Sequence, residues 1–435
     1  MSAPKLNQSW QHRMMHWSGY PWLVWGLGAA FFFSEYLARL APNVMVSQLM
    51  AQFHLNAWGI GVLSSYFYWP YIIMQLPVGL FVDRYGAHAL LMVMTFVCAL
   101  SCYIFSVSHV VVWVYFARFL LGVAGAFAFV ATLKLAAVWF PAHRFGLLAG
   151  ATQALGMLGA AFGEGPVAML VSWSDWRFTL LLMSCVFFVL AILIGLFVRD
   201  RGEHDSVELT RHAYVDLWRG LRHVLKNKQT WYNALFAALI YAPTGAFAEL
   251  WGVTYLQHVQ NMSHTVSANA MSMVFIGWGI GGPLCGGLSD RIKKRKPFMF
   301  GSALLSLLFL AGALYGHFGS DVPVFVCLFM YGLANSGLVI AYALSGEINP
   351  QWVVGISIAF ANMASVVLAP LFQDLAGWLL VKQWAGTMLN GVPSYTVSAY
   401  QWSTVALPLS LILAFFVAFK VEETHCQRIE VRKVG

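Results

Sequence analysis

Apolar stretches of about 20 residues recur along almost the whole chain, and no other feature constrains its fold as strongly. A helix of this length crosses a hydrocarbon core of roughly 30 Å, where the backbone must satisfy its own hydrogen bonds. Since 60% of the residues are hydrophobic and only 10% are charged, a soluble domain is excluded. The sequence predicts an all-α membrane protein with twelve transmembrane helices, near residues 20–48, 58–82, 89–107, 110–139, 145–171, 177–198, 231–257, 266–288, 298–318, 322–347, 353–382 and 400–421.

Lysine and arginine are distributed unevenly between the two sets of loops. If the N-terminus is cytoplasmic, the loops on the opposite side hold no basic residue, and these loops are 49–57, 108–109, 172–176, 258–265, 319–321 and 383–399. The positive-inside rule then places both termini of this multi-pass protein in the cytoplasm. The formal net charge of +8 follows from this topology, so a lipid bilayer is expected as a partner and nucleic acid is not.

Two related segments, Leu76–His88 and Pro283–Lys296, indicate that the chain consists of similar halves. In each segment a glycine-containing helix end runs into an Asp-Arg pair. Such charges belong to a short turn on one membrane face, where they can join neighbouring helices and lock that face. Any membrane protein can carry Asp-Arg in a short loop, but the repetition favours a conformational role. The predicted gating residues are Gly79, Asp83, Arg84, Asp290, Arg291 and Glu347.

Four parts are predicted along the chain. They are an N-terminal six-helix bundle (1–198), a cytoplasmic linker (199–230), a second six-helix bundle (231–421) and a cytoplasmic tail (422–435). The linker places apolar residues at helical spacing with basic residues between them, which predicts an amphipathic helix on the inner leaflet. A simple connector is favoured there over a partner-binding segment. The six cysteines lie in predicted spans or in the tail, so no disulfide is expected.

Several motifs make the chain similar to the major facilitator superfamily over essentially its whole length. Gly79–Gly86 (GLFVDRYG) resembles the signature between helices 2 and 3 of that family, although Ala87 and His88 replace its usual basic residues. Arg118–Gly122 (RFLLG) resembles a helix 4 pattern whose arginine is often linked to proton movement. The resemblance implies two pseudo-symmetric six-helix bundles around a central cavity that opens to alternate sides.

Other segments refine this resemblance. Gly156–Pro166 partly resembles the Gly-Pro element of antiporters, but Glu164 is foreign to that element and antiport is not inferred. Glu35–Gly86, Thr132–Pro141 and Glu249–Tyr255 are similar to a bacterial branch related to lysosomal dipeptide transporters and to nutrient transporters of intracellular bacteria. This branch implies a location in the bacterial inner membrane.

Charged side chains inside the spans are the leading substrate-binding candidates, because burying them is costly unless they serve a pathway or a partner. Arg39 is expected to hold a substrate carboxylate, with Glu35 four residues earlier tuning it; alternatively, the two only neutralise each other. Lys134 either adds a second positive charge or extends to the inner interface. Glu249 is expected to bind a substrate ammonium group or a coupling proton; alternatively, it only forms a hydrogen bond to a neighbouring helix.

Buried carboxyl groups are also candidates for proton coupling, since a proton removes the cost of an ionised carboxylate in an apolar span. The offset of 207 to 210 residues between the halves pairs Glu164 with Asp374 and brings Arg39 close to Glu249. The proton-coupling candidates are Glu249, Glu164, Arg118 and Asp374.

Neutral polar side chains inside the spans are expected to line the cavity, because they orient a solute without the full cost of a charge. The expected wall comprises Tyr36, Tyr66, Tyr68, Tyr71, Gln75, Gln153, Tyr241, Trp251, Tyr255, Asn335, Tyr342, Asn362 and Gln373.

These features predict a secondary active transporter that performs proton-coupled uptake of a small carboxylate-bearing or zwitterionic solute, such as an amino acid, a short peptide or a related nutrient. The alternatives are a carboxylate-siderophore transporter, a drug or metabolite efflux pump, and a non-transporting membrane receptor. The sequence carries no phosphate-binding, Cys-x-x-Cys or zinc-peptidase motif, so no enzymatic activity, cofactor or metal is expected. A monomer is expected, because this fold usually works as one.

Overall fold

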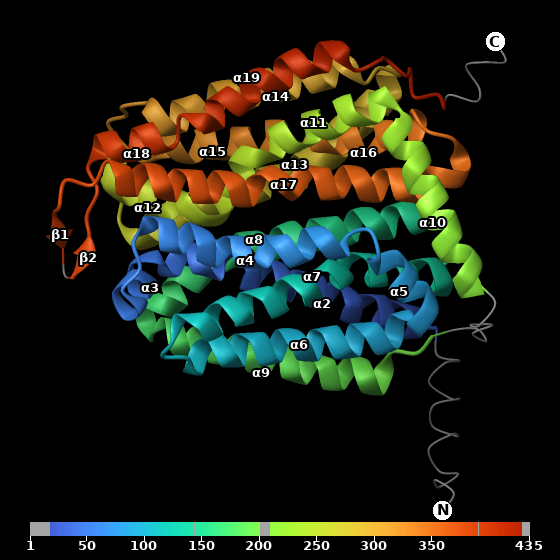
Figure 1. Ribbon diagram of the computed structural model, residues 1–435, viewed down its shortest axis with the longest axis horizontal. Coiled ribbons are helices and arrows are strands. Elements are labelled where there is room, and N and C mark those ends of the chain that lie inside the picture. Colours follow the sequence, from blue (N-terminus) through green and yellow to red (C-terminus); the bar gives the residue numbers. More distant parts are fainter. Residues whose placement is uncertain (1–17, 142–143, 201–208, 390, 429–435) are drawn as a thin grey trace, which may run out of the picture.

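The computed structural model describes residues 18–141, 144–200, 209–389 and 391–428, and most of them are α-helical. Most helices run alongside one another in Figure 1, whereas α10 (Leu209–Lys226) crosses one end of them. A short antiparallel hairpin of β1 (Met388–Leu389) and β2 (Val392–Pro393) lies at the other end. We call these two ends the linker end and the hairpin end. The predicted all-α fold is confirmed.

The first group of helices is coloured blue to green in Figure 1. Its members are α2 (Tyr20–Leu40), the 3-10 helix η1 (Ala41–Met45), α3 (Val46–Phe53), α4 (Ala57–Met74), α5 (Val78–Tyr85), α6 (Ala87–Val107), α7 (Val111–Trp139), α8 (Phe145–Trp173) and α9 (Trp176–Phe197). The predicted spans 20–48 and 58–82 are therefore interrupted. Pro42 and Pro77 lie at the interruptions, where a missing N–H and a ring clash disfavour a continuous α-helix.

The second group runs from yellow-green to red in Figure 1. It comprises α11 (Lys228–Pro243), the π-helix η3 (Thr244–Trp251), α12 (Gly252–Val259), α13 (His264–Ile292), α14 (Lys296–Tyr315), α15 (Val322–Asn335), α16 (Leu338–Glu347), the 3-10 helix η4 (Gln351–Val353), α17 (Val354–Lys382), α18 (Val397–Ser403) and α19 (Ala406–Lys420). Ten helical segments of the described chain are long and apolar enough to cross a membrane. The two interrupted spans are not among them, so the count of twelve stays a prediction.

Helix α10 occupies the predicted linker and packs on the second group of helices. Val224 is buried in a small cluster with Val353 and Phe360. Trp218 and Arg222, in contrast, are exposed. The location of this helix on the inner leaflet stays a prediction. The predicted cytoplasmic termini lie partly outside the described residues.

The two groups of helices contact each other along two pairs of helices, α4 with α17 and α8 with α13. The Ser65 hydroxyl donates to the Pro370 carbonyl at 3.2 Å, and the Ser272 hydroxyl donates to the Ala161 carbonyl at 2.8 Å. The serines are 207 residues apart and the two acceptors 209, which is the offset between the halves. Equivalent hydrogen bonds therefore join the groups on both sides of the molecule, as pseudo-symmetry requires.

Equivalent glycines also allow close helix crossings within each group. A Cβ atom on Gly122 of α7 would lie 2.0 Å from the Phe67 carbonyl oxygen, and one on Gly332 of α15 would lie 2.0 Å from the Val274 carbonyl oxygen. Helix backbones approach this closely only where no side chain intervenes. Both crossings therefore require glycine for steric reasons.

We expect Gly122→Ala and Gly332→Ala to destabilise the protein by ~1–3 kcal/mol each, because the backbone rather than a flexible side chain must move. Gly301→Ala on α14 is the matched control, since nothing lies within 4 Å of its added Cβ. The control is expected to be neutral or stabilising, because alanine is the better helix former. Thermal unfolding in detergent measures all three, and equal effects would contradict the steric argument.

Candidate functional site

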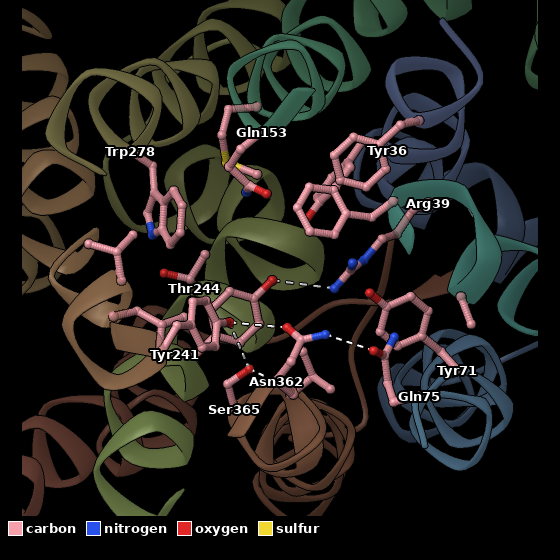
Figure 2. Close-up of a pocket in the computed structure, with 18 of the residues that line it drawn as sticks. Tyr36, Arg39, Tyr71, Gln75, Gln153, Tyr241, Thr244, Trp278, Asn362 and Ser365 are labelled. Atoms are coloured by element: carbon pink, nitrogen blue, oxygen red, sulfur yellow. Dashed lines mark hydrogen bonds between the residues drawn. The ribbon is translucent and has the colours of Figure 1, made fainter. Parts of the chain in front are cut away.

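A central cavity of about 230 Å³ lies between the two groups of helices, and its wall is shown in Figure 2. The wall combines aromatic, amide and apolar side chains: Phe32, Tyr36, Arg39, Tyr71, Gln75, Ala126, Phe129, Val130, Gln153, Met157, Tyr241, Thr244, Phe275, Trp278, Leu338, Val339, Tyr342, Asn362, Ser365 and Val366. Six predicted substrate-binding residues are present, namely Arg39, Tyr36, Tyr71, Gln153, Tyr342 and Asn362. Among the described residues of the wall, Arg39 alone is charged.

Arg39 lies in the last turn of α2 and forms a buried ion pair with Glu249 of η3. The Arg39 Nη2 and Glu249 Oε2 atoms are 3.0 Å apart, and each side chain is only 2% exposed. The hydroxyls of Tyr68 and Tyr241 also donate to the Glu249 carboxylate. A guanidinium and two hydroxyls therefore bind the Glu249 carboxylate.

Aromatic rings surround the Arg39 guanidinium. Its Cζ atom lies 5.0 to 5.5 Å from the ring centroids of Tyr36, Phe67, Tyr68 and Tyr71. The negative ring faces stabilise a cation that has been removed from water. The site is thus a desolvated cation that both a carboxylate and aromatic rings stabilise.

Glu249 reaches Arg39 from a stretch of π-helix. Pro243 is the last residue of α11, and it carries no N–H to continue the α-helical pattern. The following residues, Thr244–Trp251, form η3, and all of them are buried. π-Helical turns are frequent at functional sites because they shift the side chains that follow. Local chain geometry therefore directs this acidic side chain toward the first group of helices.

Glu35 takes no part in the Arg39 ion pair and does not line the cavity. Its carboxylate packs against α7, where a Cβ on Gly125 would lie 2.7 Å from Glu35 Oε1. That oxygen has no hydrogen-bond partner in the described part of the chain. Arg118 is also buried and donates to the Arg39 carbonyl at 3.2 Å. The intrahelical Glu35–Arg39 pair that the spacing allowed is therefore not formed.

The remaining proton-coupling candidates lie at the contacts between the two groups of helices. Glu164 of α8 is completely buried and accepts a hydrogen bond from Asn43 at 2.7 Å. Asp374 of α17 accepts one from Ser65 of α4 at 2.8 Å. Neither carboxylate lines the central cavity or forms an ion pair with another described residue.

Lys134 lies away from the central cavity, so it does not supply a second positive charge there. Its Nζ atom is 2.7 Å from Asp83 Oδ1, and the two side chains are 44% and 65% exposed. Arg84 instead stacks on Tyr85, with Cζ 5.2 Å from the ring centroid. Of the two alternatives for Lys134, the structure shows extension toward the end of the helix, where it pairs with the predicted gating residue Asp83.

In the second half the two predicted gating carboxylates, Asp290 and Glu347, pair with Arg295, which was not predicted as a gating residue. Arg295 lies 2.7 Å from Asp290 and 2.5 Å from Glu347. Arg291 is exposed and forms no ion pair with another described residue. The pairing of Asp290 and Glu347 through a buried arginine joins the ends of α13 and α16.

Glu423 extends this charged cluster from the segment after α19. Its carboxylate accepts backbone N–H bonds from Arg295 at 2.8 and 3.0 Å and from Lys296 at 2.9 Å. Burial alone would raise the pKa of this carboxyl, but the N–H donors of Arg295, Lys296 and His425 lower the pKa below its usual value. Ionised Glu423 therefore stabilises the start of α14.

Two other pockets lie near the central cavity, one toward each end of the molecule. A pocket of about 480 Å³ extends toward the linker end past Gly79 and Asp83. An amide hydrogen bond of 2.8 Å from Asn362 to Gln75 lies where this pocket meets the cavity (Figure 2). At the hairpin end, a pocket of about 340 Å³ is lined by Asn43 and is separate from the cavity.

Six residues of the expected wall do not line the central cavity, namely Tyr66, Tyr68, Trp251, Tyr255, Asn335 and Gln373. Trp251 lines the hairpin-end pocket and donates from its indole N–H to the Gln373 carbonyl at 3.1 Å. Tyr255 is buried and donates to the Leu314 carbonyl at 2.6 Å. Both side chains serve helix packing, because interhelical hydrogen bonds and wall positions produce the same polar signal in an apolar span.

Three polar or amphipathic wall residues were not predicted: Thr244, Trp278 and Ser365. Trp278 lies between Gly277 and Gly279 in the middle of an apolar span. Most tryptophans of membrane proteins lie at the membrane–water interfaces, so the central position of Trp278 could have identified it as a wall residue. Small hydroxyl residues such as Thr244 and Ser365 gave no such signal, because they are common throughout transmembrane helices.

The fold and the cavity define a polytopic α-helical membrane protein with a solute-sized site between two related groups of helices. The sequence profile of the Major Facilitator Superfamily matches residues 24–370. The chain therefore belongs to this superfamily of membrane transporters.

Individual relatives agree with this assignment. The chain is 24% identical over 419 residues to the uncharacterized transporter YybO of Bacillus subtilis, covering 91% of this chain and 93% of YybO. It is 23% identical over 376 residues to the probable sulfoacetate transporter SauU of Cupriavidus necator, covering 84% and 81% of the two chains. The structure matches an inward-facing bacterial homologue of the human lysosomal transporter Spinster, with a TM-score of 0.73, 14% identity and coverage of 93% and 97%.

We expect Glu423→Gln to reduce stability at neutral pH and to lose this effect in acid. The folded-state pKa lies below the ordinary value of 4.5, so the carboxylate contributes stability above that pH and the contribution disappears as the pH falls through the folded value. Melting temperatures of wild type and variant should therefore converge on acidification. Glu422→Gln is the neighbouring control, and a difference between wild type and Glu423→Gln that persists in acid would contradict the helix-capping role.

We expect Arg39→Met to destabilise the protein by ~3–5 kcal/mol, because it leaves the Glu249 carboxylate buried without its counter-ion. The double variant Arg39→Met/Glu249→Gln should recover part of this loss, since no buried charge remains unpaired. Lys134→Met is the control for an exposed ion pair and should cost at most ~1 kcal/mol. Thermal unfolding measures the set, and a double variant less stable than Arg39→Met would refute the pairing argument.

Proposed function

We propose that this chain is a proton-coupled secondary transporter for a small organic acid or zwitterion that carries a carboxylate. The observation that carries the proposal is Arg39, the one charged side chain among the described residues of the central cavity wall. A guanidinium binds a carboxylate bidentately, and a desolvated site strengthens that contact. The name of the relative SauU supports the same class, since sulfoacetate is a small organic acid.

The size of the cavity supports a small substrate. Pockets for drug-sized ligands hold ~300–1,000 Å³, whereas this cavity holds about 230 Å³. A single amino acid or simple organic acid fits this volume better than a siderophore or a large drug. The neutral groups of Gln153 and Tyr36 line the same cavity as Arg39 (Figure 2), where they can orient the rest of the solute.

Glu249 provides the coupling step in this proposal. While it is ionised, it occupies Arg39 at 3.0 Å, so a substrate carboxylate must compete with it. A proton on Glu249 removes the competing charge and leaves Arg39 to bind the substrate. Substrate and proton therefore favour each other's binding, which is the requirement for symport.

The predicted orientation gives the direction of opening. With the linker end in the cytoplasm, the pocket past Gly79 and Asp83 connects the cavity toward the inside. At the hairpin end, the buried Arg39–Glu249 pair and Asn43 lie between the cavity and the outer pocket. We therefore assign the structure to an inward-facing conformation of an alternating-access cycle, in which the Asp83–Lys134 pair and the pairs of Arg295 with Asp290 and Glu347 hold the helix ends at the linker end within each half.

Uptake into proteoliposomes tests the proposal, with candidate acids first selected by thermal shift of the purified protein. An inward proton gradient should drive accumulation of a labelled organic acid. Arg39→Lys should lower uptake at least ~10-fold, equivalent to ~1.4 kcal/mol of lost binding, because lysine cannot make the bidentate contact. Glu249→Gln should retain counterflow exchange but lose stimulation by the proton gradient.

Lys134→Met is the control, since that cation lies outside the cavity. Stabilisation by cationic drugs alone, unchanged in Arg39→Lys, would overturn the organic-acid assignment in favour of efflux. Binding without counterflow in wild type would indicate a receptor.

A further inference from the structure

A second buried carboxyl group, Glu164, has surroundings unlike those of Glu249. It lies on α8 beside η1 and η3, and none of its surface is exposed. Asn43 of η1 is 1% exposed, and its Nδ2 atom donates to Glu164 Oε1 at 2.7 Å and to the Ala248 carbonyl at 3.0 Å. The two hydrogens of this amide are thus both used, which fixes its orientation.

The Glu164–Asn43 pair has two further oxygen atoms that these hydrogen bonds do not involve. Within the described part of the chain, neither Glu164 Oε2 nor Asn43 Oδ1 has a hydrogen-bond partner. An ionised carboxylate and an amide oxygen are both acceptors, so neither can satisfy the other. A neutral carboxylic acid adds one O–H donor, and an acid and an amide joined by one N–H···O bond place that O–H next to the amide oxygen. One proton on Glu164 Oε2 would supply the donor that Asn43 Oδ1 lacks.

We propose that Glu164 holds a proton in this conformation, as the neutral acid of a doubly hydrogen-bonded pair with Asn43, and that this proton is required to close the hairpin end. The pair's role in coupling rests on the proposed transport function, whereas its protonation does not. The proton comes from water at the hairpin end when that end is open, and it returns there when the pair separates.

The charged groups around Glu164 agree with a neutral acid. Glu249 on η3 is negative and opposes a second negative charge, while Arg39 on α2 is already paired with Glu249. Arg118 of α7 donates to the Arg39 carbonyl at 3.2 Å. His264 at the start of α13 bonds the Val44 carbonyl at 2.9 Å. None of these cations pairs with Glu164, so burial of an ionised carboxylate there would lack compensation.

The pair also connects the two groups of helices. Asn43 and Glu164 belong to the first group, and Ala248 belongs to the second. Beside them, the backbone N–H of Gly165 donates to the Ser272 hydroxyl of α13 at 3.0 Å. Separation of the groups at the hairpin end would remove the Ala248 acceptor from Asn43 and admit water to Glu164. Deprotonation and opening therefore favour each other.

Infrared difference spectroscopy tests the protonation directly. The wild type should show the carbonyl stretch of a protonated carboxyl at neutral pH, and one component of this band should be lost in Glu164→Gln. Glutamine keeps both hydrogen bonds to Asn43, so this variant should fold and stay closed. Asp374→Asn is the matched control, because Asp374 is the pseudo-symmetric equivalent and accepts from Ser65 at 2.8 Å. An unchanged band in Glu164→Gln would overturn the proposal.

Cysteine labelling tests the closure. Ser365 lines the central cavity, so the variant Ser365→Cys places a thiol there. An impermeant maleimide applied at the hairpin end reaches this thiol only when that end opens. Labelling should rise severalfold with increasing pH in the wild-type background and in Asp374→Asn, and stay low at every pH in Glu164→Gln. The chain without Ser365→Cys gives the background from the six native cysteines. The same pH response in Glu164→Gln would refute closure by this proton.

Neither readout needs a transported solute. Failure of organic-acid uptake with both results intact would therefore reject the proposed substrate and retain the proton site. Normal uptake with an unchanged infrared band would do the reverse.

Discussion

The buried ion pair between Arg39 and Glu249 joins the two halves of this protein, and the other features of the site depend on it. The two residues are 210 positions apart and occupy equivalent places in the two halves. Burial costs several kcal/mol for each ion, which only close pairing and further hydrogen bonds offset. Tyr68 and Tyr241 supply those bonds. A ligand or proton that replaces either partner therefore changes the balance between the halves.

Three buried carboxyl groups near this pair differ because their partners differ. Glu249 receives a guanidinium and two hydroxyls. Glu164 receives one amide, and its remaining oxygen faces no donor among the described residues. Glu35 packs on Gly125 with an oxygen that likewise lacks a described partner. We infer that the three carboxyl groups have separate roles, since each has a different set of partners.

Sequence reasoning was most successful where duplication constrained it. The offset between the halves predicted that Arg39 and Glu249 lie close together, and the structure confirms this contact. The offset did not predict which arginine pairs with Asp290, because the conformation of a local turn determines that pairing. Lys293, which follows the last residue of α13, has the left-handed conformation with φ of 56°, so the chain reverses and Arg295 lies near the helix end. A turn of this kind depends on tertiary packing, whereas the apolar spans follow from composition alone.

The two ends of the cavity differ in the cost of opening them. At the hairpin end, opening separates a buried ion pair, and leaving one such charge uncompensated costs ~3–5 kcal/mol. At the linker end, the amide hydrogen bond between Asn362 and Gln75 contributes ~0.5–1.5 kcal/mol. The Asp83–Lys134 pair is exposed and lies within one half, so it does not oppose separation of the halves. In the absence of substrate, the linker end is therefore the cheaper end to open. Opening of the hairpin end requires a change in the charge of the buried Arg39–Glu249 pair, so that step depends on the binding or release of a proton or a solute.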